Sequence, residues 1–189
     1  MADALKRKLS EFSSLTENEW EQLSSCFHHL SVPRGSFILK EGQICDSVYF
    51  VNKGAFRHYF LKDGDEIHTA FSFENSFVAN TRSLTEQLPS DQFIVAMENS
   101  EVIRMYRTDL FVMYKSIPSF EVIGRQMLQS MIVAQEARTA LFMLYTPEER
   151  YQKLLSEITE MLKRLPLQQI ASYLGIARET LSRIRNRLH

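Results

Sequence analysis

Three charged side chains near the C-terminal end have the types and spacing to hydrogen-bond to the edges of nucleic-acid bases. Arg178 and Glu179 are adjacent, and Arg183 follows about one helical turn later. An arginine can donate two hydrogen bonds to guanine O6 and N7, and a glutamate can accept one from cytosine N4. An exposed acid weakens attraction to a polyanion, so Glu179 among arginines favours the reading of base sequence over unspecific charge attraction.

The segment that carries these residues, LQQIASYLGIARETLSRIRNRL, fits a helix-turn-helix. Two short helices that cross steeply need a small residue where they touch, here Ala171, and a residue free to turn sharply between them, here Gly175. Their shared core needs apolar residues at fixed offsets, and the segment supplies Ile170, Leu174, Ile176, Leu181 and Ile184. The pattern therefore predicts a second helix that enters a DNA major groove with its first turns.

The expected DNA-contacting residues all lie on this second helix. Arg185 and Arg187 are expected to contact phosphates, although solvated arginines at a helix C-terminus explain these two equally well. The full set is Arg178, Glu179, Thr180, Ser182, Arg183, Arg185 and Arg187.

The charge distribution agrees with a polyanionic partner for the C-terminal end. The net charge of the whole chain is -1, but residues 163–189 contain six basic residues and one acidic residue. That segment carries +5, which leaves -6 on the preceding 162 residues. A basic end on an acidic body favours contact with nucleic acid.

Upstream of this segment, the hydrophobic period changes twice along the chain. Thr16 and Glu19 form a capping box that opens a helix, which is expected to run to Pro33. From there to about residue 107, short runs rich in aromatic and β-branched residues are separated by turn signals. This pattern predicts an antiparallel sandwich or barrel with room for a pocket.

A long helix is expected to follow the barrel over residues 117–145. Small and apolar residues recur in it at alternating spacings of three and four, which is typical of a coiled-coil seam between two copies of a chain. The alternative, that this stripe packs on the barrel of its own chain, stays open. The stripe consists of Phe120, Ile123, Met127, Ser130, Ala134, Ala137, Leu141 and Leu144.

A second capping box, Thr146 with Glu149, opens the C-terminal helical module, and Pro147 occupies the first helical position. The predicted fold class is α+β. An antiparallel jelly-roll or barrel sensor domain covers residues 1–116, a dimerisation helix covers 117–145, and an all-α helix-turn-helix domain covers 146–189.

This order of elements, with Arg178-Glu179-Thr180 and then Arg183 on the recognition helix, resembles the Crp/Fnr superfamily of dimeric transcription factors. The resemblance spans nearly the whole chain and implies that Arg178, Glu179 and Arg183 read bases. Two features depart from the family pattern: Ala177 stands where a serine is usual, and the sequence ends at His189 without the usual β-hairpin wing. We therefore expect fewer contacts with the DNA backbone.

The sensor half departs further from the members that bind cyclic AMP. Those members carry a Gly-Glu pair for the ribose and an Arg followed by a small hydroxyl residue for the cyclic phosphate, and the counterparts here are Ala79-Asn80 and Ser90-Asp91. Because the Asp91 carboxylate would repel the phosphate, a cyclic nucleotide is disfavoured. Two interpretations stay open for a group of polar residues: they line a pocket for another anion, or they are exposed turn residues. The group consists of Arg57, Asn80, Thr81, Arg82 and Asp91.

The sequence supports neither a cofactor nor a metal site. Cys26 and Cys45 lie far apart, without a CxxC motif. His58 and His68 are better explained as ordinary strand histidines than as haem or metal ligands. No leader or membrane span is evident, so we expect a cytoplasmic, bacterial-type protein.

The expected partners are duplex DNA with an inverted-repeat site, a second copy of the chain, RNA polymerase, and an effector of unknown identity if one exists. Two other functions stay open. One is a cupin-like metal enzyme, which would need more histidines than His58 and His68 on neighbouring strands. The other is a protein-interaction module that uses the same barrel.

Overall fold

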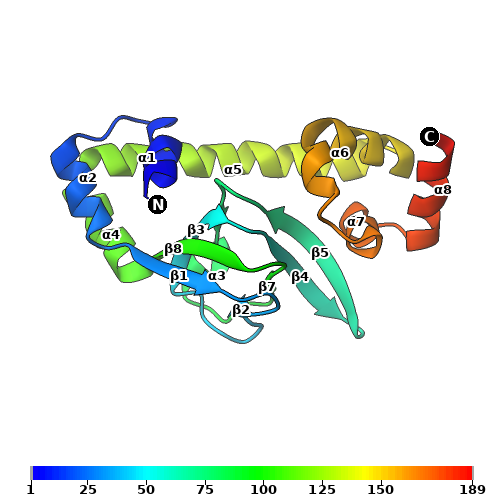
Figure 1. Ribbon diagram of the computed structural model, residues 1–189, viewed down its shortest axis with the longest axis horizontal. Coiled ribbons are helices and arrows are strands. Elements are labelled where there is room, and N and C mark those ends of the chain that lie inside the picture. Colours follow the sequence, from blue (N-terminus) through cyan, green and yellow to red (C-terminus); the bar gives the residue numbers. More distant parts are fainter. Residues whose placement is uncertain (1, 189) are drawn as a thin grey trace.

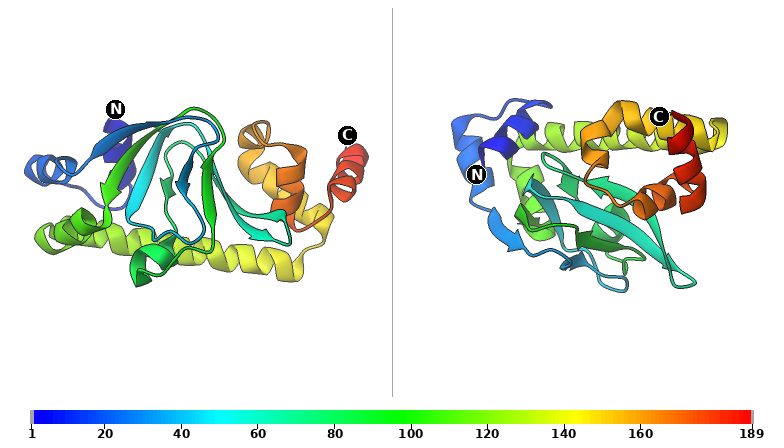
Figure 2. Two further views of the ribbon diagram at one scale, coloured as in Figure 1. Left: turned by 90° about the horizontal axis from the view of Figure 1, so that it is seen from below. Right: turned by 45° about the vertical axis from the view of Figure 1, so that its right-hand side comes forward.

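The computed structural model describes residues 2–188, apart from the side chains of residues 157–161. A β-sandwich with short helices at its N-terminal side is followed by one long helix and a three-helix module (Figure 1). The long helix runs along the sandwich and reaches the three-helix module at its far end (Figure 2). No helix in the described part of the chain is long and apolar enough to cross a membrane.

The sandwich consists of two antiparallel four-stranded sheets. The first has the order β1-β8-β3-β6, and the second has the order β2-β7-β4-β5. The strands are β1 (His28–Val32), β2 (Phe37–Leu39), β3 (Ser47–Lys53), β4 (Phe56–Lys62), β5 (Asp65–Ser72), β6 (Phe77–Val78), β7 (Phe93–Ala96) and β8 (Ser100–Tyr106). The antiparallel sandwich expected from the short aromatic and β-branched runs is confirmed, and a core that includes Val51, Phe56, Ile94 and Val102 holds its sheets together.

The helix expected to run to Pro33 is shorter than predicted. It is α2 (Glu17–Ser24), and its Thr16–Glu19 capping box is present. His28–Val32 instead forms β1, which pairs with β8 along its whole length. Pairing with β8 gives hydrogen-bond partners to the backbone N–H and C=O groups of this segment. This stabilises the segment more than a continuation of α2 would.

The remaining helices surround the sandwich. α1 (Asp3–Ser10) and α3 (Thr81–Glu86) are short, and α4 (Arg107–Ser116) leads into the long α5 (Pro118–Leu144). The C-terminal module contains α6 (Pro147–Leu162), α7 (Leu167–Leu174) and α8 (Arg178–Leu188). As predicted, α6 begins at Pro147, and Thr146 and Glu149 form their capping box.

The structure corrects the N-terminal half of the expected seam on α5. Phe120 and Ile123 are 5% and 0% exposed, and both belong to a core in which α5 packs on the first sheet. Met127 is half-buried and packs against the same core. These three residues face the barrel of their own chain, so they are not available to a second copy.

Further along α5, Ser130, Ala134, Ala137 and Leu144 are exposed and Leu141 is half-buried. Several large apolar residues outside the expected stripe are exposed too, namely Leu128, Met131, Ile132, Val133, Phe142 and Met143. The helix therefore has one face on its own chain and a second apolar face toward solvent.

Candidate nucleic-acid interface

Helices α7 and α8 form the predicted pair with a sharp turn between them. Gly175 ends α7 with a φ of 67°, in the left-handed region that favours glycine. The Ile176 N–H donates to the Ala171 carbonyl across 3.0 Å, which closes the turn. The predicted roles of Ala171 and Gly175 are confirmed, since Ala171 is 1% exposed where the two helices touch.

The core beneath these helices contains the predicted apolar residues. Leu174 and Leu181 are fully buried, Ile170 and Ile184 nearly so, and Ile176 is half-buried at the edge. Because these residues fix which side of α8 faces inward, they also fix which side faces solvent.

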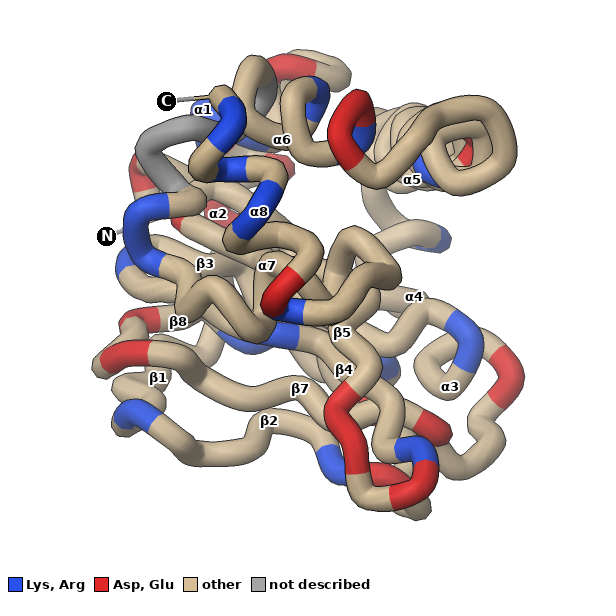
Figure 3. Tube along the Cα trace, turned by 90° about the vertical axis from the view of Figure 1, so that its right-hand side faces the viewer, with Lys and Arg blue, Asp and Glu red and all other residues tan. Residues whose placement is uncertain are grey.

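The solvent side of α8 carries the charged residues that the sequence singled out. Arg178, Glu179 and Arg183 are exposed, and with Ser182 and Leu167 they line one shallow hollow. Thr180 is half-buried. Basic residues follow one another along α8 in the view from this end of the molecule (Figure 3). Geometrically, this surface can place two guanidinium groups and one carboxylate against a single partner.

The two arginines expected to contact phosphates also lie at the exposed surface. Arg185 is exposed and has no ion-pair partner among the described residues. The Arg187 Nη1 atom lies 3.8 Å from Glu148 Oε2 on α6, and 68% of the Arg187 side chain is exposed. A pair this exposed contributes little to stability and leaves the guanidinium accessible.

A polar contact that no local sequence pattern predicts docks the helix-turn-helix onto the β-sandwich. The Ser172 hydroxyl donates to the Glu66 carbonyl across 2.8 Å and accepts from the His68 N–H across 3.0 Å. β5 is an edge strand, so its outward backbone groups need partners from outside the sheet. Ser172 supplies both partners at this point of the edge.

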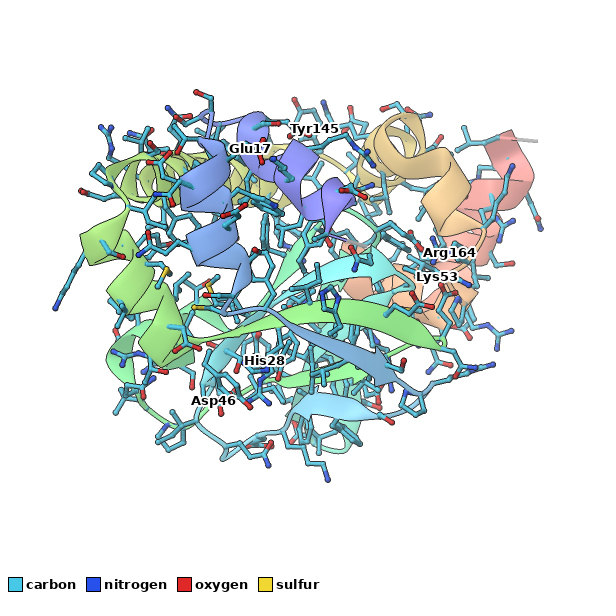
Figure 4. All side chains as sticks on the ribbon, turned by 60° about the vertical axis from the view of Figure 1, so that its left-hand side comes forward. Glu17, His28, Asp46, Lys53, Tyr145 and Arg164 are labelled. Carbon is cyan, nitrogen blue, oxygen red and sulfur yellow. The ribbon has the colours of Figure 1, made fainter. Side chains whose placement is uncertain are left out.

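A second docking contact joins Arg164 to two barrel carboxylates. The Arg164 guanidinium, labelled in Figure 4, donates to both carboxylate oxygens of Glu74 at 2.8 and 3.0 Å and also pairs with Glu98. Hydrogen bonding from Arg164 lowers the pKa of Glu74 to about 2. Neither Arg164 nor Ser172 has a local sequence signal, because their partners lie between 66 and 106 residues away along the chain.

The expected effector residues make contacts on two parts of the β-sandwich. Arg57 on β4 pairs with Glu66 and lies against the Tyr59 ring, at the side where α7 docks. Arg82 pairs with Glu86 and lies 3.6 Å from Asp91, at the surface around α3. Thr81 is exposed at the start of that helix. Arg82 and Asp91 therefore lie together beside α3, whereas Arg57 is engaged by Glu66 and Tyr59.

Asn80 is engaged within the protein. Its side-chain carbonyl caps α3 by accepting from the Ser83 N–H, and its amide donates to the Ser90 hydroxyl across 3.0 Å. Asn80 and Ser90 are 7% and 3% exposed. The two positions that the resemblance assigns to ribose and phosphate recognition thus bond to each other.

The two barrel histidines lie in different environments. The His58 Nε2 atom lies 3.0 Å from the Ser72 hydroxyl, and burial lowers the pKa of His58 to about 4. His68 lies beside Arg57 and Glu66, and burial lowers its pKa too. No group of three His, Cys, Asp or Glu side chains among the described residues is arranged to hold a metal ion.

Comparison with known proteins identifies the architecture. Residues 29–116 match the family model of the cyclic nucleotide-binding domain. A search of curated protein sequences finds no match to the chain.

Several solved structures share the fold over most of their length. FixK2 from Bradyrhizobium japonicum is 22% identical with a TM-score of 0.75, over 86% of this chain and 84% of that one. The catabolite activator protein of Thermus thermophilus is 22% identical with a TM-score of 0.60, over 96% and 86%. The regulator CLP of Xanthomonas campestris is 16% identical with a TM-score of 0.69, over 92% and 91%.

A transcriptional regulator of the Crp/Fnr family from Eubacterium rectale is also similar, with 16% identity and a TM-score of 0.68, over 92% of this chain and 83% of that one. The resemblance expected from the sequence is confirmed in the fold. Residues 29–116 match the cyclic nucleotide-binding domain model, and the chain shares its fold with solved structures that include a regulator of the Crp/Fnr family.

Proposed function

We propose that this protein is a homodimeric regulator that binds duplex DNA sequence-specifically through α8. The observation that carries the proposal is the shared exposure of Arg178, Glu179 and Arg183 on one side of α8, opposite the buried Leu181 and Ile184. A helix with one polar and one apolar face can present hydrogen-bonding side chains to a major groove, while its apolar face packs on the rest of the C-terminal module.

The mixed charge of this surface supports sequence reading. Arg178 and Arg183 can each donate two hydrogen bonds to a guanine, and Glu179 can accept from a cytosine. Arg185 and Arg187 follow toward the helix end, where they can neutralise phosphates. Solved structures with the same fold include a catabolite activator protein and a transcriptional regulator of the Crp/Fnr family, which supports the class of function.

The exposed apolar face of α5 supports the homodimer. Ile132, Gln135, Thr139 and Phe142 are all exposed and follow one another at spacings of three, four and three. This is the spacing of a coiled-coil seam, placed on the side of α5 that does not face its own barrel. The proposed seam is thus rotated about the helix from the stripe expected from the sequence.

For the sensor domain we propose that cyclic nucleotides are not the ligand. The hydrogen bond between Asn80 and Ser90 occupies both groups at the expected ribose and phosphate positions, and the nearby Arg82 is already paired with Asp91 and Glu86. A cyclic phosphate would have to break the buried Asn80–Ser90 bond and compete with two carboxylates for Arg82.

Selection of bound duplexes from a random pool, with the purified full-length chain at stated salt, tests the function. We expect an inverted repeat whose half-site centres lie about one DNA turn apart, ~34 Å. The control is the double variant Arg178→Ala and Arg183→Ala, which keeps Arg185 and Arg187. A wild-type protein that enriches no sequence, or one that enriches the same sequences as this control, would contradict the proposal.

A further inference from the structure

An apolar cavity of about 370 Å³ lies on the outer face of the first sheet, away from the barrel interior and from the DNA-reading surface. Its floor includes Phe50 of β3 and Ile103 of β8, and its walls include Leu9 of α1 and Phe120 of α5. These four side chains are at most 5% exposed. The volume falls within the range of small-molecule sites, at its lower end.

One wall of the cavity depends on a close approach between α4 and α5. A Cβ atom added at Gly124 would lie 2.6 Å from the ring of Tyr114, so only glycine leaves space for this ring. Burial raises the pKa of the Tyr114 hydroxyl. The wall therefore offers one hydroxyl in an otherwise apolar surface.

The mouth of the cavity differs from its interior. Thr81 and Thr85 of α3 line it and are exposed, as are Phe111, Leu128 and Met131. Arg107, the first residue of α4, lies beside this mouth. Its Nε atom donates to the carbonyl of Leu84, which lines the cavity, and its guanidinium stacks 4.6 Å from the centre of the Phe111 ring.

The Arg107 guanidinium is held by these two contacts without a carboxylate partner among the described residues. Its Nη atoms are thus available at the point where the apolar interior meets solvent. An arginine accepts a carboxylate in preference to an uncharged group, because its N–H groups match the two oxygens.

We propose that this cavity binds a straight-chain aliphatic carboxylate of medium length, with its chain against Phe50 and Phe120 and its carboxylate on Arg107. The apolar lining excludes a polar or highly charged ligand from the interior, because such a ligand would lose its hydration without finding partners. The binding event does not depend on DNA binding, so each can fail without the other.

Calorimetric titration of the full-length protein with decanoate tests the proposal. We expect saturable binding at about one decanoate per chain and none with acetate, which has the same charge without the chain. Decan-1-ol is expected to bind more weakly than decanoate. Absence of binding up to millimolar decanoate, or equal heats with acetate, would overturn the proposal.

Two variants with matched controls locate the site. Thr85→Trp places a large ring at the mouth and should weaken decanoate binding at least tenfold, whereas Glu86→Trp, the next residue on α3, should leave it within twofold. Arg107→Gln should weaken decanoate at least tenfold and decanol less than threefold. Lys115→Gln removes an exposed charge from the same helix and should change neither.

The single tryptophan provides a second readout that does not need these variants. The Trp20 ring lies 5.6 Å from the ring of Phe27, which lines the cavity. Decanoate should therefore change Trp20 fluorescence in the wild-type protein with the same midpoint as the calorimetric titration. Equal effects of Arg107→Gln and Lys115→Gln on binding would contradict the carboxylate site, as would calorimetric binding that leaves Trp20 fluorescence unchanged.

Discussion

Ser172 of α7 hydrogen-bonds to the backbone of Glu66 across 106 positions of sequence. The same hydroxyl accepts from the N–H of His68, so one side chain satisfies two backbone groups of an edge strand. With the ion pairs of Arg164, this contact fixes the helix-turn-helix relative to the β-sandwich. The position of α8 therefore depends on contacts that involve β5.

The first prediction concerns this docking contact. Ser172→Ala removes the partner of a part-buried N–H and of a carbonyl, so the amide of His68 should exchange with solvent faster than in the wild-type protein. Hydrogen exchange followed by mass spectrometry measures this. Ser156→Ala, on the exposed surface of α6, is the control and should leave the exchange of β5 unchanged.

The second prediction separates base reading from backbone contact on α8. Arg178→Ala and Arg183→Ala should each cost ~1 to 3 kcal/mol on the selected site and relax the preference at one base position. Glu179→Ala should weaken discrimination more than affinity. Binding to selected and random duplexes measures both quantities, and equal losses on the two would contradict base reading.

The third prediction concerns Arg185 and Arg187, the two arginines proposed to contact phosphates. Arg185→Ala and Arg187→Ala should weaken binding to every sequence alike, because a phosphate carries no base identity. The slope of log K against log salt should fall by about one for each arginine removed, and by about twice that in a dimer. An unchanged salt slope would mean that these two arginines do not contact the DNA backbone.

The fourth prediction distinguishes two faces of α5. Ile132 is 59% exposed and lies in the proposed seam, so Ile132→Asp should give monomers by burying an unpaired charge at the interface. Ala137→Asp changes the stripe expected from the sequence and should leave the dimer intact. Sedimentation at micromolar concentration measures the mass, and dimeric Ile132→Asp with monomeric Ala137→Asp would reverse the assignment.

The fifth prediction is a pH dependence set by His58. Its pKa is about 4 in the folded protein and 6.5 in the unfolded chain, so only the unfolded chain takes up this proton between these values. The free energy of unfolding should therefore fall as pH decreases from 6.5 toward 4, by about 1.4 kcal/mol per pH unit from this group. Above pH 6.5 His58 should contribute no pH dependence.

Urea unfolding of the wild-type protein and of His58→Gln, at pH 7.5 and pH 5, measures this contribution. The variant should lose less stability on acidification than the wild-type protein. The lowered pKa of His68 acts in the same direction in both proteins and cancels in the comparison. Equal losses in the two proteins would show that His58 does not cause the effect.

The sequence by itself determined the features of the fold that depend on interactions between residues only a few positions apart. Gly175 predicted the turn of the helix-turn-helix because a positive φ strongly favours glycine. The capping boxes at Thr16 and Thr146 predicted two helix starts, since each box joins residues only three positions apart. The exposed charges of α8 followed from its buried apolar residues by helical period alone.

Tertiary contacts decided the rest. His28–Val32 became a strand because β8, more than 60 residues away, pairs with its backbone. An apolar stripe on α5 could pack on a barrel or on a second copy, and only the placed sheet assigned Phe120 and Ile123 to the protein's own core. Ser172 and Arg164 gave no local signal, because their role depends on where the edge of β5 and the carboxylate of Glu74 lie after folding.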